Sequence, residues 1–371
     1  NMFMLMTVAA ILIYLCHKLY TSKKSSLLKM HMINIGDANE VLLLKGVVAG
    51  KMSFFQIDTG YAGPPVISTT YLSMDDSTRR TIFNDFSTVN QYSKTLKAIN
   101  KRASQKHRNI AINSFLKNSG CFSYTSGCTM RLMGIGSIVE QQADMFLCDP
   151  LTFYNREDQL VAPKRINFSN RGDVLVTNPL PSSVHILTMD YLLHLSPCCM
   201  YMKEQALEFS ISNIRFDILR HSFSFVPLRT TGGSPVIKIK IGGEIFECTM
   251  DTGAPGSVSL GIQASERLTQ CKSLNRSVTQ RGVNGETICS SIISTDVSIS
   301  GVTIKDADIF INDTTVDHTD GYVGLGFLRS FDIMITGESI GFRQSGLSPR
   351  YTKDFPSGNG ACTNINLKCE Q

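Results

Sequence analysis

The 371-residue chain contains no tryptophan and no pair of cysteines in CxxC spacing. Its eleven cysteines stand at other separations, so the sequence predicts no zinc-type metal centre. No cofactor is expected either. Charged residues make up 18% of the chain and hydrophobic residues 42%, a balance that excludes a disordered protein. A chain of this length can bury one large core or two domain-sized cores.

Acidic residues are almost missing between positions 79 and 108, where Asp85 stands against eight basic residues. The surrounding stretch, residues 76–117, is polar, and its apolar residues recur at roughly helical spacing. We interpret it as a basic helical insertion. A basic face can bind nucleic acid or anionic lipid, but no aromatic-rich module accompanies this one. A solvated surface insertion is therefore favoured, and no nucleic-acid partner is expected.

No charge occurs in the first sixteen residues, NMFMLMTVAAILIYLC. This run is slightly short for a membrane span and at the upper edge for the apolar part of a signal peptide. Because HKLYTSKK follows it in place of a small-residue cleavage site, we predict a retained single-pass anchor and basic linker over residues 1–30. The lysines that follow the run place the remaining chain on the cytosolic side by the positive-inside rule, with the secretory pathway as the alternative.

The cysteines outside this run allow two interpretations. Cys121 with Cys128, Cys271 with Cys289, and Cys362 with Cys369 are local pairs that could form disulfides, whereas free buried thiols explain the same residues equally well. The adjacent Cys198 and Cys199 are expected in the core or in a disulfide.

Short strand-like runs rich in Val, Ile, Phe and Thr, punctuated by Gly and Asp-Gly, dominate the rest of the chain. Two of these runs end in the same way. FFQIDTGYAGPPVIS, residues 54–68, is echoed by FECTMDTGAPGSVSL, residues 246–260, so that Asp58 and Asp251 lie 193 positions apart. Each places Asp-Thr-Gly after an apolar run and continues through small residues into Val, Ile or Leu.

The repeat extends further along the chain. SSVHILTMDYLLHL, residues 182–195, follows the first Asp-Thr-Gly, and DGYVGLGFLRSFDI, residues 320–333, follows the second. Two copies of one β unit predict a pseudo-symmetric, two-lobed body. We place the first lobe at residues 31–230 with the insertion at 76–117, the second lobe at 231–345, and a loop-like tail at 346–371.

The paired Asp-Thr-Gly turns suggest acid-base chemistry by two carboxyl groups. Gly60 and Gly253 permit tight turns, and Thr59 and Thr252 can hydrogen-bond across the pseudo-twofold axis. Asp58 and Asp251 would then face one another, and two such close carboxylates cannot both ionise readily. The ionised member can take a proton from water that attacks an amide carbonyl, while the protonated member stabilises the oxyanion.

With these motifs the sequence resembles the pepsin-like and retroviral-type (retropepsin-like) aspartic peptidases. DTGYAGPPVIS and DTGAPGSVSL are similar to the catalytic loops of that family, and YVGLGFLRSFDI is similar to its glycine-containing ψ-loop segment. FSYTSG, with Tyr124, resembles the flap that closes over substrate, and GVNGET, with Gly285, resembles an opposing hairpin. The resemblance implies an all-β, bilobal fold and an aspartic endopeptidase that acts as a monomer on polypeptides, with Asp58 and Asp251 as its catalytic residues.

Two departures from the family pattern affect the expected chemistry. The bilobal members usually carry Ser or Thr after Asp-Thr-Gly, whereas this chain has Tyr61 and Ala254. Without those hydroxyl groups we expect a dyad with higher apparent pKa values and an activity optimum nearer neutral than that of pepsin. Thr188 also stands where the first ψ-loop would carry glycine, so the first lobe is expected to pack its loop differently.

Two other functions are compatible with the sequence. The chain could be a pepsin-fold protein that binds a peptide or partner with little or no turnover, as Tyr61 and Thr188 suggest. Alternatively, residues 231–345 alone could act as a retropepsin-like unit that forms a homodimer. Two unrelated β-turns would explain the Asp pair without any function, but would not explain why the flanking segments repeat.

Overall fold

The computed structural model describes the body of the chain in segments, which are residues 27–36, 39–48, 50–68, 123–134, 137–148, 150–163, 173–178, 185–231, 233–254, 256–268, 272–281, 287–312 and 319–349, together with Ile11 and Tyr14. In several strands, including most of residues 123–148 and 272–289, only the backbone is described. The predicted insertion at 76–117 and most of the predicted tail and N-terminal segment lie outside these residues. Within the described residues, no helix is long and apolar enough to cross a membrane.

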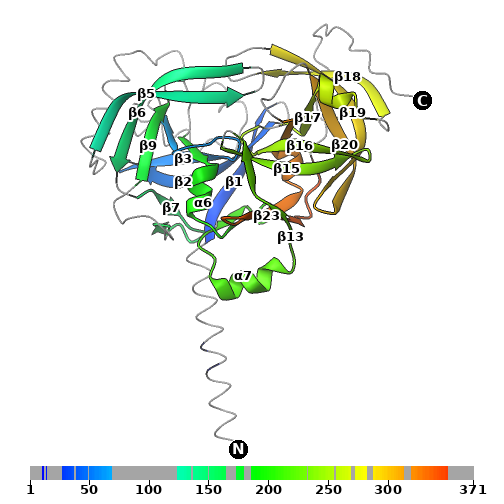
Figure 1. The fold of residues 1–371 in the computed structure, drawn as a ribbon. Helices are drawn as coiled ribbons and strands as arrows, with labels where there is room; N and C mark the ends of the chain where they lie inside the picture. Colours follow the sequence, from blue (N-terminus) through cyan, green and yellow to red (C-terminus); the bar gives the residue numbers. More distant parts are fainter. Residues whose placement is uncertain are drawn as a thin grey trace, which may run out of the picture.

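The fold is all-β and has two lobes (Figure 1). The strands of the first lobe are β1 (Leu27–Gly36), β2 (Asn39–Val48), β3 (Lys51–Asp58), β4 (Val66–Ser68), β5 (Ser123–Gly134), β6 (Ser137–Cys148), β7 (Thr152–Tyr154), β8 (Leu160–Val161), β9 (Asp173–Asn178) and β10 (His185–Thr188). They run in the spatial order β1-β2-β3-β10-β4-β9-β6-β5, with β7 paired to β2 and β8 paired to β7.

The second lobe is an 8-stranded sheet in the order β14-β15-β16-β21-β17-β20-β19-β18. Its elements are β14 (Arg229–Thr231), β15 (Ser234–Ile241), β16 (Glu244–Asp251), β17 (Val258–Gly261), α8 (Ile262–Ser265), β18 (Lys272–Arg281), β19 (Thr287–Ile299), β20 (Val302–Asn312) and β21 (Gly321–Gly324). Sequence pattern explains the first hairpin of this sheet. Ile237, Ile239 and Ile241 point into the core while the lysines between them are exposed, and Gly242 and Gly243 turn with positive φ of 55° and 102°.

A layer of strands from both halves joins the lobes. Its strands are β11 (Cys198–Tyr201), β12 (Ala206–Glu208) and β13 (Ser224–Pro227) from the first half, and β22 (Phe331–Ile335) and β23 (Ser339–Gln344) from the second. In the chain, α6 (Met189–His194) precedes β11, α7 (Asn213–Arg220) precedes β13, and α9 (Leu325–Leu328) precedes β22. β22 pairs with β11, and β23 pairs with β13. The chain after Ser330 therefore pairs with the first half, whereas the sequence-based division assigned it to a separate lobe at 231–345.

The two halves follow the same path through the Asp-Thr-Gly loops. β3 lies parallel to β10, which brings Asp58 opposite Thr188, and β16 lies parallel to β21, which brings Asp251 opposite Gly324. β4 is antiparallel to β10 and parallel to β9, just as β17 is antiparallel to β21 and parallel to β20. The predicted internal repeat is thus a repeat of strand pairing.

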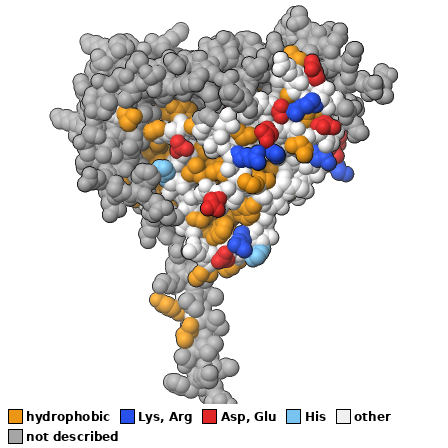
Figure 2. All heavy atoms as spheres, in the orientation of Figure 1, with side chains coloured by type: hydrophobic (Ala, Val, Ile, Leu, Met, Phe, Trp, Pro, Cys, Tyr) orange, Lys and Arg blue, Asp and Glu red, His pale blue; other side chains and the backbone are white. Residues whose placement is uncertain are grey.

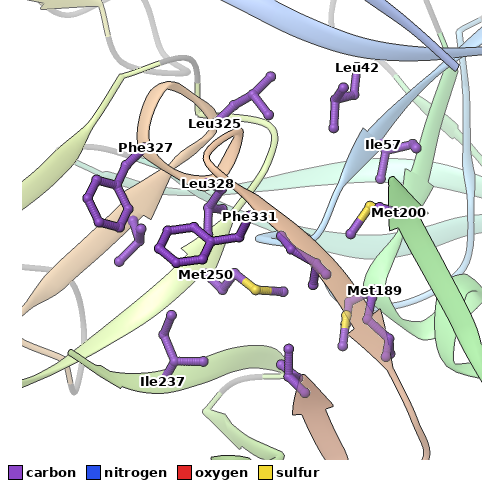
Figure 3. Close-up of a cluster of buried hydrophobic side chains, with 14 of the residues drawn as sticks. Leu42, Ile57, Met189, Met200, Ile237, Met250, Leu325, Phe327, Leu328 and Phe331 are labelled. Atoms are coloured by element: carbon purple, nitrogen blue, oxygen red, sulfur yellow. The ribbon is translucent and has the colours of Figure 1, made fainter. Parts of the chain in front are cut away.

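One apolar core continues beneath both loops (Figure 3). Ile57 and Met250, the residues directly before the two aspartates, are both fully buried in it. Met189 and Leu325, which follow the two ψ-loop segments, belong to the same core. Because these neighbours are packed, the two aspartates cannot move independently of the lobes.

Cys198, Cys199 and Cys248 are free thiols in the core. Burial raises the pKa of Cys198 to about 12, so this thiol is inert. Cys198 and Cys199 are therefore core residues, one of the two interpretations that the sequence allowed. The three predicted disulfide pairs all include residues outside those whose side chains the structure describes.

Candidate active site

Hydrogen bonds between the two Asp-Thr-Gly loops join the lobes. Thr59 Oγ1 donates to the carbonyl of Met250 at 2.9 Å and accepts from the N–H of Thr252 at 3.0 Å. Thr252 Oγ1 donates to the carbonyl of Ile57 at 2.9 Å and accepts from the N–H of Thr59 at 3.1 Å. Both threonines are fully buried. These reciprocal bonds are the cross-axis pattern that the sequence suggested.

The glycines of the loops lie against the opposite aspartates. A Cβ atom on Gly60 would lie 2.4 Å from Cγ of Asp251, and one on Gly253 would lie 2.4 Å from Cγ of Asp58. Real Cβ atoms do not approach other atoms so closely. Each lobe therefore supplies both one carboxyl group and the space that the other carboxyl group needs.

Two further side chains hold the glycine peptides from across the lobe boundary. Ser234 Oγ donates to the carbonyl of Gly60 at 2.6 Å, and Gln56 Nε2 reaches the carbonyl of Gly253 at 3.4 Å. Neither residue was among the predicted site residues. Each lies far from its partner in the chain, so no local sequence pattern could pair them.

The two carboxyl groups are hydrogen-bonded to each other and differ in environment. Burial, then the charge of Asp251, then the hydrogen bond between the two groups raise the pKa of Asp58 well above that of a free carboxyl group. Burial also raises the pKa of Asp251, but the hydrogen bond from Asp58 and those from backbone N–H groups oppose this. Gly253 N donates to Asp251 Oδ1 at 2.8 Å, and Ala254 N donates to the same atom at 3.1 Å. Backbone N–H groups of Gly60 and Tyr61 likewise lower the pKa of Asp58, but burial dominates for both groups, so the pair retains a proton at a pH where a free carboxyl group has lost it.

The residues after the two Asp-Thr-Gly turns have different surroundings. Tyr61 is half-buried, and burial followed by the charge of Asp58 raises the pKa of its phenol, which stays neutral. Ala254 is buried and carries no polar side chain. A neutral phenol therefore lies beside one aspartate and a methyl group beside the other.

Thr188 gives the first ψ-loop its own packing, as its sequence position suggested. Its Oγ1 donates to the carbonyl of Gly63 at 2.6 Å and accepts from the N–H of Tyr191 at 3.3 Å, so it caps α6. Asp190 completes this arrangement by accepting from the N–H of Gly63 at 2.8 Å.

The predicted flap residues lie in less completely described parts of the chain. Tyr124 is on β5, where it pairs with Phe146 of β6, and its side chain is not described. Gly285 lies outside the described residues, between β18 and β19. The two hairpins, β5–β6 and β18–β19, occupy equivalent places at the outer ends of their sheets.

Two histidines lie further along the first lobe, in β10 and in α6. His185 is fully buried, its Nδ1 accepts from the N–H of Ser68 at 2.9 Å, and burial lowers its pKa to about 3. His194 is exposed in the last turn of α6. Among the described residues, no group of His, Cys, Asp and Glu side chains has a metal-binding arrangement.

No family model matches the sequence, and no curated protein sequence matches it. Among solved structures, the chain resembles a retropepsin-like aspartic protease from Rickettsia conorii at 16% identity and a TM-score of 0.26, over 32% of this chain and 90% of that one. It also resembles basic 7S globulin from soybean at 11% identity and a TM-score of 0.42, over 91% of this chain and 99% of that one. These similarities are too low to indicate a function. The chain is an all-β protein of two lobes, and its two Asp-Thr-Gly loops meet between them.

Proposed function

We propose that the chain is an aspartic endopeptidase that hydrolyses polypeptides as a single molecule. The observation that carries this proposal is that Asp58 and Asp251 meet between the lobes, each carboxyl group against the glycine of the opposite loop, and are supported by the reciprocal bonds of Thr59 and Thr252. Unlike the threonines, both aspartates keep some exposed surface, so a water molecule and a substrate can reach them.

The asymmetry of the pair assigns the two acid-base roles. In this proposal Asp251, whose Oδ1 accepts from the N–H groups of Gly253 and Ala254, is the ionised member and takes a proton from the attacking water. Asp58 is the protonated member and donates a hydrogen bond to the developing oxyanion of the amide. Collapse of the tetrahedral intermediate breaks the C–N bond, and a proton passes to the leaving nitrogen. The dyad then again holds a single proton.

The raised pKa values bear on the pH range of activity. Activity needs one proton on the pair, so it falls when both groups are ionised at high pH and when both are protonated at low pH. Because burial raises both pKa values, both limits move upward, and the optimum lies nearer neutral than that of pepsin. A profile that peaks below about pH 3 would contradict this assignment.

The homodimer alternative is less well supported than the single-chain reading. Both carboxyl groups come from one chain, and β22 and β23, which a separate second lobe would need, pair with β11 and β13. A binding protein without turnover remains the second candidate. Tyr61 favours it, because its bulk stands beside Asp58 where the family carries a small hydroxyl residue.

We also propose that residues 1–16 anchor the protein in a membrane. Their uncharged run and the lysines that follow support this assignment. The side of the membrane on which the body lies is open between the cytosol and the secretory pathway.

The decisive experiment is cleavage of a peptide library by the full chain between about pH 3 and pH 8, with and without pepstatin. Asp58→Asn and Asp251→Asn should each reduce cleavage by about a thousandfold or more. Activity that survives Asp58→Asn would favour the homodimer, since that arrangement uses only Asp251. A folded wild-type chain that binds pepstatin but cleaves no peptide would instead favour the binding protein.

A further inference from the structure

Helix α7 exposes two isoleucines on the face that points away from the body. Ile214 and Ile218 are 66% and 67% exposed, and they lie one helical turn apart on the same stripe. In the part of the body that the structure describes, no other two large apolar side chains are exposed at this spacing. Phe216 and Leu219, on the opposite side of the helix, pack against buried residues.

This orientation of α7 is fixed by polar contacts as well as by packing. Arg215 forms an ion pair with Glu208 through its Nε and donates from its second guanidinium nitrogen to Oε2 at 3.0 Å. The side chain of Glu208 is 1% exposed, so losing its partner would leave a buried charge. Ser212 caps the helix by accepting from the N–H of Arg215 at 3.4 Å. Rotating the helix to bury the two isoleucines would break these contacts and would therefore be unfavourable.

The helix lies where the described chain enters the body. Its inner face packs on a group that we call the base cluster, which consists of Leu27, Cys199, Tyr201, Ala206, Ile211, Phe223 and Met334. Leu27 is the first residue of β1. In Figure 1, α7 projects from the lower side of the body, and in Figure 2 hydrophobic side chains gather at the lower end of the described surface.

The distance from this entry point to the uncharged run is short. Ten residues, 17–26, separate that run from Leu27. Even fully extended they span at most about 35 Å. If residues 1–16 lie in a bilayer, the side of the body that carries α7 is therefore the side nearest to it. Lys18, Lys23 and Lys24 on this linker would draw it further towards anionic headgroups.

We propose that the exposed face of α7 docks on the surface of the lipid bilayer that holds the N-terminal run. This inference rests on the proposed anchor and is independent of the proposed peptidase activity. Ile214 and Ile218 enter the headgroup region, while the flanking Asn213 and Asp217 stay in water, so insertion is shallow. Two contacts, the anchor and α7, then fix how the body stands on the membrane.

The absence of tryptophan from the chain makes a direct test possible. Ile214→Trp and Ile218→Trp each introduce a single fluorophore into the full chain, which is reconstituted in vesicles of phosphatidylcholine with phosphatidylserine. Ile245→Trp is the matched control, because Ile245 is 60% exposed on β16 and is not part of the base cluster. Equal thermal melts by circular dichroism show that each variant is folded.

We expect the two α7 variants to emit at shorter wavelength in vesicles and to lose about half or more of their emission to brominated lipids, while Ile245→Trp does neither. Emission from both α7 variants that matches the control would overturn the proposal. Shorter-wavelength emission without quenching by brominated lipid would also overturn it, because protein would then cover the face. If the chain does not float with the vesicles, both the proposed membrane anchor and the docking of α7 are ruled out.

Discussion

The two lobes reach the same strand pairing by different local contacts. In the second lobe, Gly324 lies so close to the catalytic loop that a Cβ atom would be 2.3 Å from the carbonyl oxygen of Gly256. In the first lobe, Thr188 occupies the equivalent place, and its hydroxyl donates to the carbonyl of Gly63. One lobe brings two backbones together directly, and the other inserts a hydrogen-bonded side chain between them. Similar strand pairing therefore does not require similar residues at each position.

The same difference extends to the carboxyl groups. The first lobe places Tyr61 beside Asp58, whereas the second places only the methyl group of Ala254 beside Asp251. The cross-lobe contacts of the glycines and threonines nevertheless remain reciprocal. Symmetry is thus retained at the contact between the loops and lost around it, so that the two acids can take different roles.

The reciprocity of the glycines is tested most sharply by adding one methyl group to each loop. Gly60→Ala and Gly253→Ala should each reduce kcat/KM by about a hundredfold, because the new Cβ must displace the opposite carboxyl group. Steady-state cleavage of one peptide at a fixed pH measures both effects. Gly337→Ala is the matched control, since no atom lies within 4 Å of its added Cβ. Equal activity of all three variants would contradict the close approach of the loops.

The difference between the ψ-loops predicts unequal losses of stability. Gly324→Ala places Cβ 2.3 Å and 2.8 Å from two carbonyl oxygens of the loop, so the backbone must shift, and we expect a loss of about 1–3 kcal/mol. Thr188→Ala removes the hydroxyl that caps α6, which should cost about 1 kcal/mol. Urea denaturation measures both. The reverse order of losses would mean that Thr188 holds the first lobe more firmly than its contacts indicate.

The contact from Ser234 to the Gly60 carbonyl should influence catalysis from the opposite lobe. Ser234→Ala removes the donor at 2.6 Å, and about a tenfold fall in kcat with little change in KM is expected as the first loop loses its fixed position. A shift in the pH profile should accompany it, which simple destabilisation would not produce. Ser222→Ala, which removes an exposed hydroxyl bonded to Leu219, should leave both quantities unchanged.

The smallest expected effect concerns stability and the protonation of Asp58. Because its folded-state pKa is raised, the native protein binds more protons than the unfolded chain above the ordinary carboxyl pKa, and stability falls as pH rises towards the folded pKa. Asp58→Asn removes this loss, so its melting temperature at pH 7 should exceed that of the wild type by roughly a few degrees. The difference should vanish below about pH 3, where the acid is protonated in both states. A variant less stable than wild type at pH 7 would contradict the raised pKa of Asp58.

Much of the fold could be predicted because its signals are local. Alternation in residues 234–241, the Gly242–Gly243 turn and the repeated Asp-Thr-Gly each depend on residues near one another in the chain. The final strands could not be assigned in the same way. Nothing local in β22 (FDIMI) or β23 (SIGFRQ) names a partner strand, and only packing places them beside β11 and β13.

The sequence by itself determined that there are two acid-bearing turns with glycine and threonine in each, since strand and turn propensities act over a few residues. Only the tertiary structure decided which partners those turns would have. Ser234 and Gln56 hold the opposite glycines, and burial raises the pKa of both aspartates. These contacts join residues more than 170 positions apart or depend on burial, and both are properties of the folded lobes together.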